Sequence, residues 1–169
     1  GYAGGEAEWT VSGGSRIALI ERVVEVTMRN PLTGLGPAAY RAYAAMKPLG
    51  YGNAFWVVPA VNSHNNYVDL FAHVGLLGLG LFLWFMGEIA ALGGRLHVRQ
   101  GRQGFLAGFV DGMLAAWAGS MALMMLADWI LPHVYNIGFP GFQASVLLWL
   151  FLGGLLVVER LGQEEGETR

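Results

Sequence analysis

The chain of 169 residues contains no cysteine. Disulfides, thiolate nucleophiles and cysteine-bound metals are therefore excluded within it. Charged residues are also scarce, at 13% of the chain, and ten basic residues against twelve acidic ones leave a formal net charge of -2. Because so few cations present no basic field to a phosphate backbone, no nucleic acid partner is expected.

Several motifs of common enzymes are missing as well. The sequence has no Asp-x-Asp pair, no His-Glu-x-x-His and no Gly-x-Ser-x-Gly, so metal-assisted and serine-nucleophile chemistry lack support. The histidines are scattered without the spacing of metal ligands, at positions 64, 73, 97 and 133. Gly34-Leu35-Gly36 lacks the remainder of a nucleotide-binding fingerprint, and we interpret it as a turn.

Apolar residues are abundant, at 54% of the chain. Three apolar runs approach the roughly 20 residues that a bilayer requires, at 74–92, 105–131 and 142–158. We therefore predict an all-α, polytopic transmembrane helical protein. Small residues recur at every fourth position from just before the second run onward, a pattern that favours close packing against another helix. They are Gly104, Gly108, Gly112, Ala116 and Ser120.

The arginines of the chain indicate how these spans are oriented. The connector 93–103 contains Arg95, Arg99 and Arg102 and no acid, so the positive-inside rule assigns it to the cytoplasm. Residues 1–73 then form an extracytoplasmic (periplasmic) loop, and 159–169 form a cytoplasmic tail. Since the chain begins at Gly1 without a signal segment, we expect it to be part of a longer protein.

The extracytoplasmic loop is predicted to carry amphipathic helices. Arg16 to Arg29 has apolar residues at helical spacing on one face, namely Ile17, Ile20, Val24 and Met28. Asn30-Pro31 ends this helix, because the residue before proline avoids the α region. A second short helix is expected at 38–46, and the stretch 47–61 is expected to be irregular.

A polar cluster, Ser63-His64-Asn65-Asn66-Tyr67, precedes the first span. Ser63 suits the N-cap of the helix that follows it. The positive end of that helix disfavours a cationic imidazole, so His64 is a candidate general base. The alternative is a histidine that only forms hydrogen bonds within a structured loop.

Arg16 is the candidate anion ligand. It is predicted to lie in the first turn of the surface helix, where a cation opposes the helix dipole and a bound anion would remove the conflict. A guanidinium can bind a phosphate through two parallel hydrogen bonds. The alternative, an ordinary solvated or lipid-facing arginine, stays open for Arg16 and also for Arg22.

Together these motifs resemble the O-antigen ligase and O-antigen polymerase superfamily. The resemblance rests on their order and covers roughly residues 13–92: Ser15-Arg16, Asn30-Pro31-Leu32-Thr33-Gly34-Leu35-Gly36, Ser63-His64-Asn65-Asn66-Tyr67 and Gly75-Leu76-Leu77-Gly78. It implies a glycosyltransferase of the bacterial inner membrane that acts in cell-surface polysaccharide (lipopolysaccharide) biosynthesis, without a metal or another cofactor. The implied donor is an undecaprenyl-diphosphate-linked glycan, and the implied acceptor is a glycan, lipid A-core or a protein.

The resemblance also suggests residue roles. His64 would deprotonate the acceptor hydroxyl as the general base, and Arg16 would bind the donor diphosphate. Asn65 and Tyr67 match the motif and are predicted to contact substrate, as is Arg22. His73 stands near a position where the family often has an acid.

Other functions stay open on the sequence alone. A polymerase of the same superfamily fits the motifs as well as a ligase. A transporter, a non-catalytic membrane component or an inactive homologue would have the same spans. No ionisable residue lies near the middle of a predicted span, which favours chemistry at the membrane surface over transport.

Overall fold

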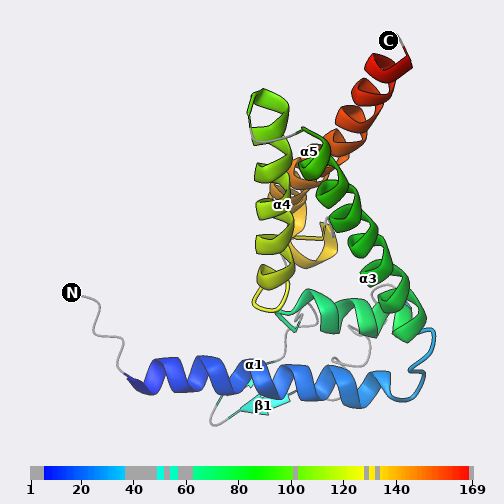
Figure 1. Cartoon of the computed structure of the whole chain (residues 1–169). Helices are drawn as coiled ribbons and strands as arrows, with labels where there is room; N and C mark the ends of the chain where they lie inside the picture. The colour runs from blue at the N-terminus through cyan, green and yellow to red at the C-terminus, as the bar shows by residue number, and fades with distance from the viewer. Residues whose placement is uncertain are drawn as a thin grey trace. The chain divides into compact units, whose positions relative to one another are not determined.

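The computed structural model describes residues 6–36, 49–51, 54–56, 63–100, 103–127, 130–131 and 134–167 (Figure 1). Their elements are α1 (Glu6–Thr27), β1 (Leu49–Tyr51), β2 (Ala54–Trp56), α3 (Asn66–Gln100), α4 (Phe105–Leu123) and α5 (Val134–Glu167). Helices long and apolar enough to cross a membrane are α3, α4 and the Gly141–Glu164 part of α5. The all-α class and the three predicted spans are therefore confirmed. The helix predicted at 38–46 lies outside the described residues.

The chain forms two compact units. The first consists of residues 1–80 with 125–128, and the second of residues 81–124 with 129–169. α1, the β-hairpin and the beginning of α3 belong to the first unit. The rest of α3, α4 and α5 belong to the second.

α1 begins at Glu6, well before the predicted start at Arg16. Arg16 therefore lies in the middle of the helix, and the prediction that it opposes the dipole in a first turn is wrong, because dipole effects fall off within a turn of the helix end. The helix ends at Thr27, whose hydroxyl donates to the Val23 carbonyl over 2.7 Å. The predicted stop before Pro31 is confirmed.

The apolar face predicted for α1 is not the face that packs on α3. Ile17 and Met28 are 61% and 59% exposed, whereas the buried apolar residues of the helix are Leu19, Val23 and Val26. Val23 packs against Ala72 and Val68 of α3. Apolar residues occupy two sides of α1, and spacing alone does not tell which side meets a partner.

A small β-hairpin interrupts the stretch predicted to be irregular. β1 and β2 pair antiparallel, with Leu49 opposite Trp56 and Tyr51 opposite Ala54. The Gly-Asn dipeptide between the strands is a hairpin signal. Three residues per strand are too few for an alternating pattern to be recognised.

α3 is broken at Gly75, which has φ 66° and ψ -168°. The polar first turns of α3 and the predicted first span are therefore two helical segments joined at this glycine. Figure 1 shows that α3 changes direction along its length. A break leaves backbone carbonyls before it and amides after it without their partners in the helix. In an apolar environment each such group costs free energy unless another group binds it.

Residues 31–36, which follow α1, supply the missing partners. Two of their amides donate to carbonyls before the break, and two of their carbonyls accept from amides after it. The four bonds are Leu35 N to Ala72 O (2.7 Å), Gly36 N to His73 O (3.1 Å), Leu76 N to Pro31 O (2.8 Å) and Leu77 N to Leu32 O (3.1 Å). We call residues 31–36 and 72–77 together the glycine junction.

Two glycines make this junction sterically possible. A Cβ atom on Gly75 would lie 2.3 Å from the Leu32 carbonyl oxygen, and one on Gly34 would lie 2.6 Å from the Gly75 nitrogen. Both residues also have positive φ, 74° at Gly34 and 66° at Gly75, which glycine adopts at little cost. The turn predicted at Gly34-Leu35-Gly36 is thus confirmed, and it packs directly on α3.

The second unit is a packed set of helices. Its buried apolar cluster draws on all three, with Leu92 and Leu96 from α3, Val110 from α4 and Leu155 and Val158 from α5. The Trp117 indole donates to the Met86 carbonyl over 3.0 Å and so links α4 to α3.

The small-residue pattern of α4 does not mark this packing. A Cβ atom on Gly108 or Gly112 would meet nothing within 4 Å, so in the part of the chain described here no residue approaches these two glycines closely. The close approaches occur at Gly93, against Leu114, and at Gly154, against Phe109. A large side chain of α4 fits over each of these glycines.

α4 ends at Leu123, not at the predicted Leu131. Its 19 residues rise about 28 Å, close to the roughly 30 Å of a hydrocarbon core. Residues 124–126 form a turn. Met125 and Leu126 belong to the first unit, where they contact the candidate site.

Gly75→Ala should destabilise the protein. The methyl group would collide with the Leu32 carbonyl, and positive φ alone costs a non-glycine residue about 1–2 kcal/mol. Gly80→Ala is the matched control, because Gly80 is helical and a Cβ atom there meets nothing within 4 Å. Thermal unfolding in detergent should show a lower Tm for Gly75→Ala alone. Equal Tm values would mean that the junction does not support the fold.

Candidate functional site

The polar loop before α3 is anchored by Asn65. Its side-chain Oδ1 accepts hydrogen bonds from the amides of Tyr67 (3.0 Å) and Val68 (3.2 Å), the second and third residues of the helix. Asn65 is therefore the N-cap, and the prediction of Ser63 in that role is wrong. Both residue types suit a cap, so the choice depends on where the helix begins, at Asn66.

Ser63 is fixed by Asp69 instead. Its amide and its hydroxyl both donate to Asp69 Oδ1, over 3.1 Å and 2.7 Å, and the Asn65 amide donates to the Ser63 hydroxyl over 3.2 Å. Ser63 and Asp69 are 1% and 4% exposed. The sequence analysis did not predict this contact. The only indication of it was an acidic residue in the first turn of the predicted helix, where the helix dipole favours a negative charge.

His64 lies between these two fixed residues. Its φ is 54°, the left-handed region, and its side chain is exposed. Histidine is among the residues enriched in this conformation. The loop therefore presents an exposed imidazole on a backbone that is held on both sides.

Arg16 and Asn65 contact the same turn, although they are far apart in sequence. The Asn65 side-chain Nδ2 donates to the Met125 carbonyl over 3.1 Å, and Arg16 Nη1 reaches the Leu126 carbonyl at 3.5 Å, a long contact. Consecutive Cα atoms are only about 3.8 Å apart. The Arg16 guanidinium is thus brought close to the loop that carries His64.

Most of the Arg16 guanidinium stays available to a ligand. The residue is exposed, and its contact with Leu126 uses one of several N–H donors. The remaining donors can form a bidentate contact with an anion.

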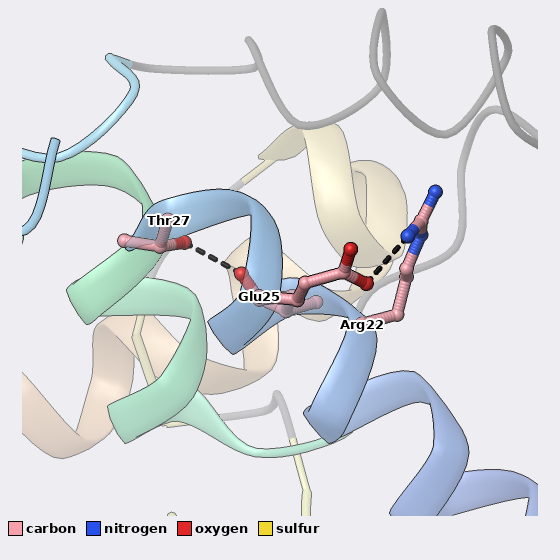
Figure 2. Close-up of polar contacts among 4 residues, drawn as sticks. Arg22, Glu25 and Thr27 are labelled. Carbon is pink, nitrogen blue, oxygen red and sulfur yellow. Dashed lines mark hydrogen bonds and ion pairs between the residues drawn. The ribbon is translucent and has the colours of Figure 1, made fainter. Parts of the chain in front are cut away.

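Arg22, also predicted to contact substrate, is placed differently. Its guanidinium forms an ion pair with Glu25 at 2.5 Å, and Figure 2 shows the two side chains pointing toward one another. At six residues from Arg16, it lies about 240° further round α1. The structure therefore does not bring Arg22 to the turn that Arg16 contacts, and its charge is balanced within the helix.

Asn66, the first residue of α3, is a polar residue to which the sequence analysis assigned no role. Its side chain is fully buried, and neither amide atom has a hydrogen-bond partner among the described residues. An unsatisfied buried amide costs about 1–3 kcal/mol. Tyr67, the next residue, is half-buried and gives its amide to the Asn65 cap.

Metal ligands do not gather in the described ranges. There, no group of three or more histidine or acidic side chains could hold a metal ion. The polar side chains around the loop are those of Arg16, Ser63, His64, Asn65, Asn66 and Asp69.

Residues 6–83 match the family model described as O-antigen ligase. The resemblance recognised in the sequence is therefore confirmed over this stretch, a little under half of the chain. No match was found among curated proteins or among solved structures. The O-antigen ligase match and the three apolar helices support a multi-pass membrane protein with an O-antigen ligase- or polymerase-like function of the glycosyltransferase type.

The O-antigen ligase match contains α1, the glycine junction and the polar loop. It does not extend to the turn with Met125 and Leu126. The contacts of Arg16 and Asn65 with that turn are accordingly a property that only the structure reveals.

Replacing Asn65 separates its two contacts. Asn65→Ala removes the cap and should lower the free energy of unfolding by about 1 kcal/mol. Asn65→Asp keeps a capping oxygen and a favourable charge at the helix start, but it loses the donor to Met125. Thermal unfolding should therefore show a lower Tm for Asn65→Ala than for Asn65→Asp. Equal losses would mean that the contact with Met125, not the cap, stabilises the loop.

Proposed function

We propose that the protein transfers a glycan from an undecaprenyl-diphosphate donor to an acceptor hydroxyl at the membrane surface. The observation that supports this most is the shared contact of Arg16 and Asn65 with the Met125–Leu126 turn. It brings a cationic group that suits a diphosphate close to the loop that carries His64, whose imidazole suits a proton acceptor. Both belong to one compact unit.

In the proposed reaction, the acceptor oxygen attacks the anomeric carbon of the donor sugar. His64 takes the hydroxyl proton as the new carbon–oxygen bond forms. The bond between the anomeric carbon and the diphosphate oxygen breaks, and the undecaprenyl diphosphate leaves with the electron pair. Arg16 binds the diphosphate and stabilises its growing negative charge. His64 then releases its proton to water.

A lipid-linked donor fits the surroundings of the loop. The α3 part of the glycine junction follows the first turns of that helix, and its Leu76 and Leu77 are 53% and 61% exposed. These leucines suit contact with lipid chains. A donor held in the membrane by its polyprenyl tail could therefore present its diphosphate to Arg16.

We further propose an orientation in the bacterial inner membrane. Residues 1–73 would face the periplasm and 159–169 the cytoplasm, which the arginine-rich connector 93–103 supports. The donor would then react on the periplasmic face. Acceptors of the proposed class are lipid A-core, a growing glycan or a protein hydroxyl.

His64→Asn should abolish most of the transfer while leaving the fold intact. Asparagine tolerates the left-handed backbone of position 64, so it is a better test than alanine, but it cannot act as a base. We expect transfer to fall on the order of a hundredfold or more. The assay uses the full-length protein in membranes with undecaprenyl-diphosphate-linked glycan and each acceptor class in turn.

Two results of this assay would contradict the proposal. Unchanged transfer by His64→Asn would remove His64 from the mechanism. No transfer by the wild type with any acceptor would favour a transporter or a non-catalytic component. The acceptor class to which the glycan is transferred distinguishes a ligase from a polymerase.

Arg16 variants test diphosphate binding. Arg16→Gln removes the charge, whereas Arg16→Lys keeps the charge and loses the planar fork. Since a hydrogen bond to a charged group contributes about 1.5–3 kcal/mol, we expect the KM for the donor to rise about 10- to 100-fold in Arg16→Gln. Arg16→Lys should lie between Arg16→Gln and the wild type.

Arg29→Gln is the matched control for Arg16→Gln. Arg29 is exposed and lies just beyond the end of α1, so its replacement should leave the KM for the donor unchanged. Equal effects of the two variants would point to general surface charge rather than to a diphosphate site at Arg16.

A further inference from the structure

A groove between α3 and α5 lies in the second unit, outside the site described above. Its volume is about 320 Å³. Phe85 and Trp149 stack at one wall with ring centroids 6.2 Å apart, and Leu156 is also part of the lining. Both helices are apolar enough to cross a membrane, so a lipid is a candidate occupant of the groove.

Three charged residues line the same groove, namely Glu88, Arg95 and Glu159. Arg95 and Glu159 have no hydrogen bond or ion pair with any described residue. Glu88 accepts a hydrogen bond from the Trp84 indole over 3.1 Å. Two carboxylates and one guanidinium give the lining both signs of charge, with a net negative balance.

The charges lie at one end of the apolar spans. Residues 76–87 of α3 and 141–158 of α5 carry no charged side chain. Glu88 is the first charge on α3 after the glycine junction, Arg95 follows about 10 Å further along the helix, and Glu159 is the first charge on α5. The groove thus combines apolar walls with a charged end, as the interface of a bilayer requires.

We propose that this groove binds a phospholipid with a phosphoethanolamine head group. The Arg95 guanidinium would bind the phosphate and the Glu159 carboxylate the ammonium group, with Glu88 deeper in the groove. One acyl chain would lie along Phe85, Trp149 and Leu156. This assignment does not depend on the proposed glycan transfer.

Charge complementarity favours this occupant over others. An anionic lipid without an ammonium group would add negative charge beside two carboxylates. The apolar face of another helix would cover Arg95 and Glu159 without giving them partners, which is costly for buried charges. A zwitterionic head group supplies a partner of the right sign to each.

Native mass spectrometry of the full-length protein in mild detergent tests the proposal. Dioleoyl phosphatidylethanolamine and dioleoyl phosphatidylglycerol are compared because their acyl chains are identical. We expect the ethanolamine lipid to be retained about fivefold more, the upper end for a single exposed ion pair. Equal retention of both lipids would overturn the proposal.

Variants identify the groups that select the lipid. Arg95→Gln should weaken retention of both lipids, and Glu159→Gln should remove the preference for ethanolamine. Arg160→Gln and Glu164→Gln are the matched controls, because neither residue lines the groove. If Arg160→Gln had the same effect as Arg95→Gln, binding would reflect general charge and the groove would not be the site.

Filling the groove gives a second, independent test. A Cβ atom on Gly153 meets nothing within 4 Å, so Gly153→Leu should occupy the groove without disturbing the fold. Retained lipid should fall about fivefold at an unchanged Tm, and unchanged retention would contradict the proposal.

A photoreactive benzoylphenylalanine at position 156 should form a lipid adduct. An adduct with another helix or with a second copy of the protein would overturn the assignment.

Discussion

The contact between the backbones at Gly34 and Gly75 is the constraint on which the first unit depends. α3 breaks at Gly75, and the break is tolerated because residues 31–36 accept and donate the hydrogen bonds that the helix loses. Four backbone bonds therefore replace those of an intact helix. They also fix the end of α1 against the beginning of α3, where Val23 meets Ala72.

The candidate site is built directly on this junction. The short part of α3 before Gly75 carries the Asn65 cap and the Ser63–Asp69 contact, which together hold the loop of His64. α1, fixed by the same junction, carries Arg16. A site assembled from short helical pieces on a shared support positions its groups more accurately than a free loop, because each piece is held by packing and hydrogen bonds.

The sequence was sufficient to predict the three spans, the turn at 33–36 and the polar loop before α3, because these depend on local composition. It did not reveal the break at Gly75, since a glycine within an apolar run is also common in ordinary membrane helices. The sequence did not show which apolar side of α1 packs on α3, because two sides of that helix are apolar. The contact of Arg16 and Asn65 with the turn after α4 joins distant segments, and no local pattern predicts such a pairing.

The glycine junction also holds one end of the chain segment that connects α1 to the polar loop. Gly36 is bonded to the His73 carbonyl and Ser63 to Asp69, so the stretch between them, 37–62, is tied down at both ends. Both ends are thus held by the beginning of α3. A change of chain length between Gly36 and Ser63 would leave these two end contacts in place.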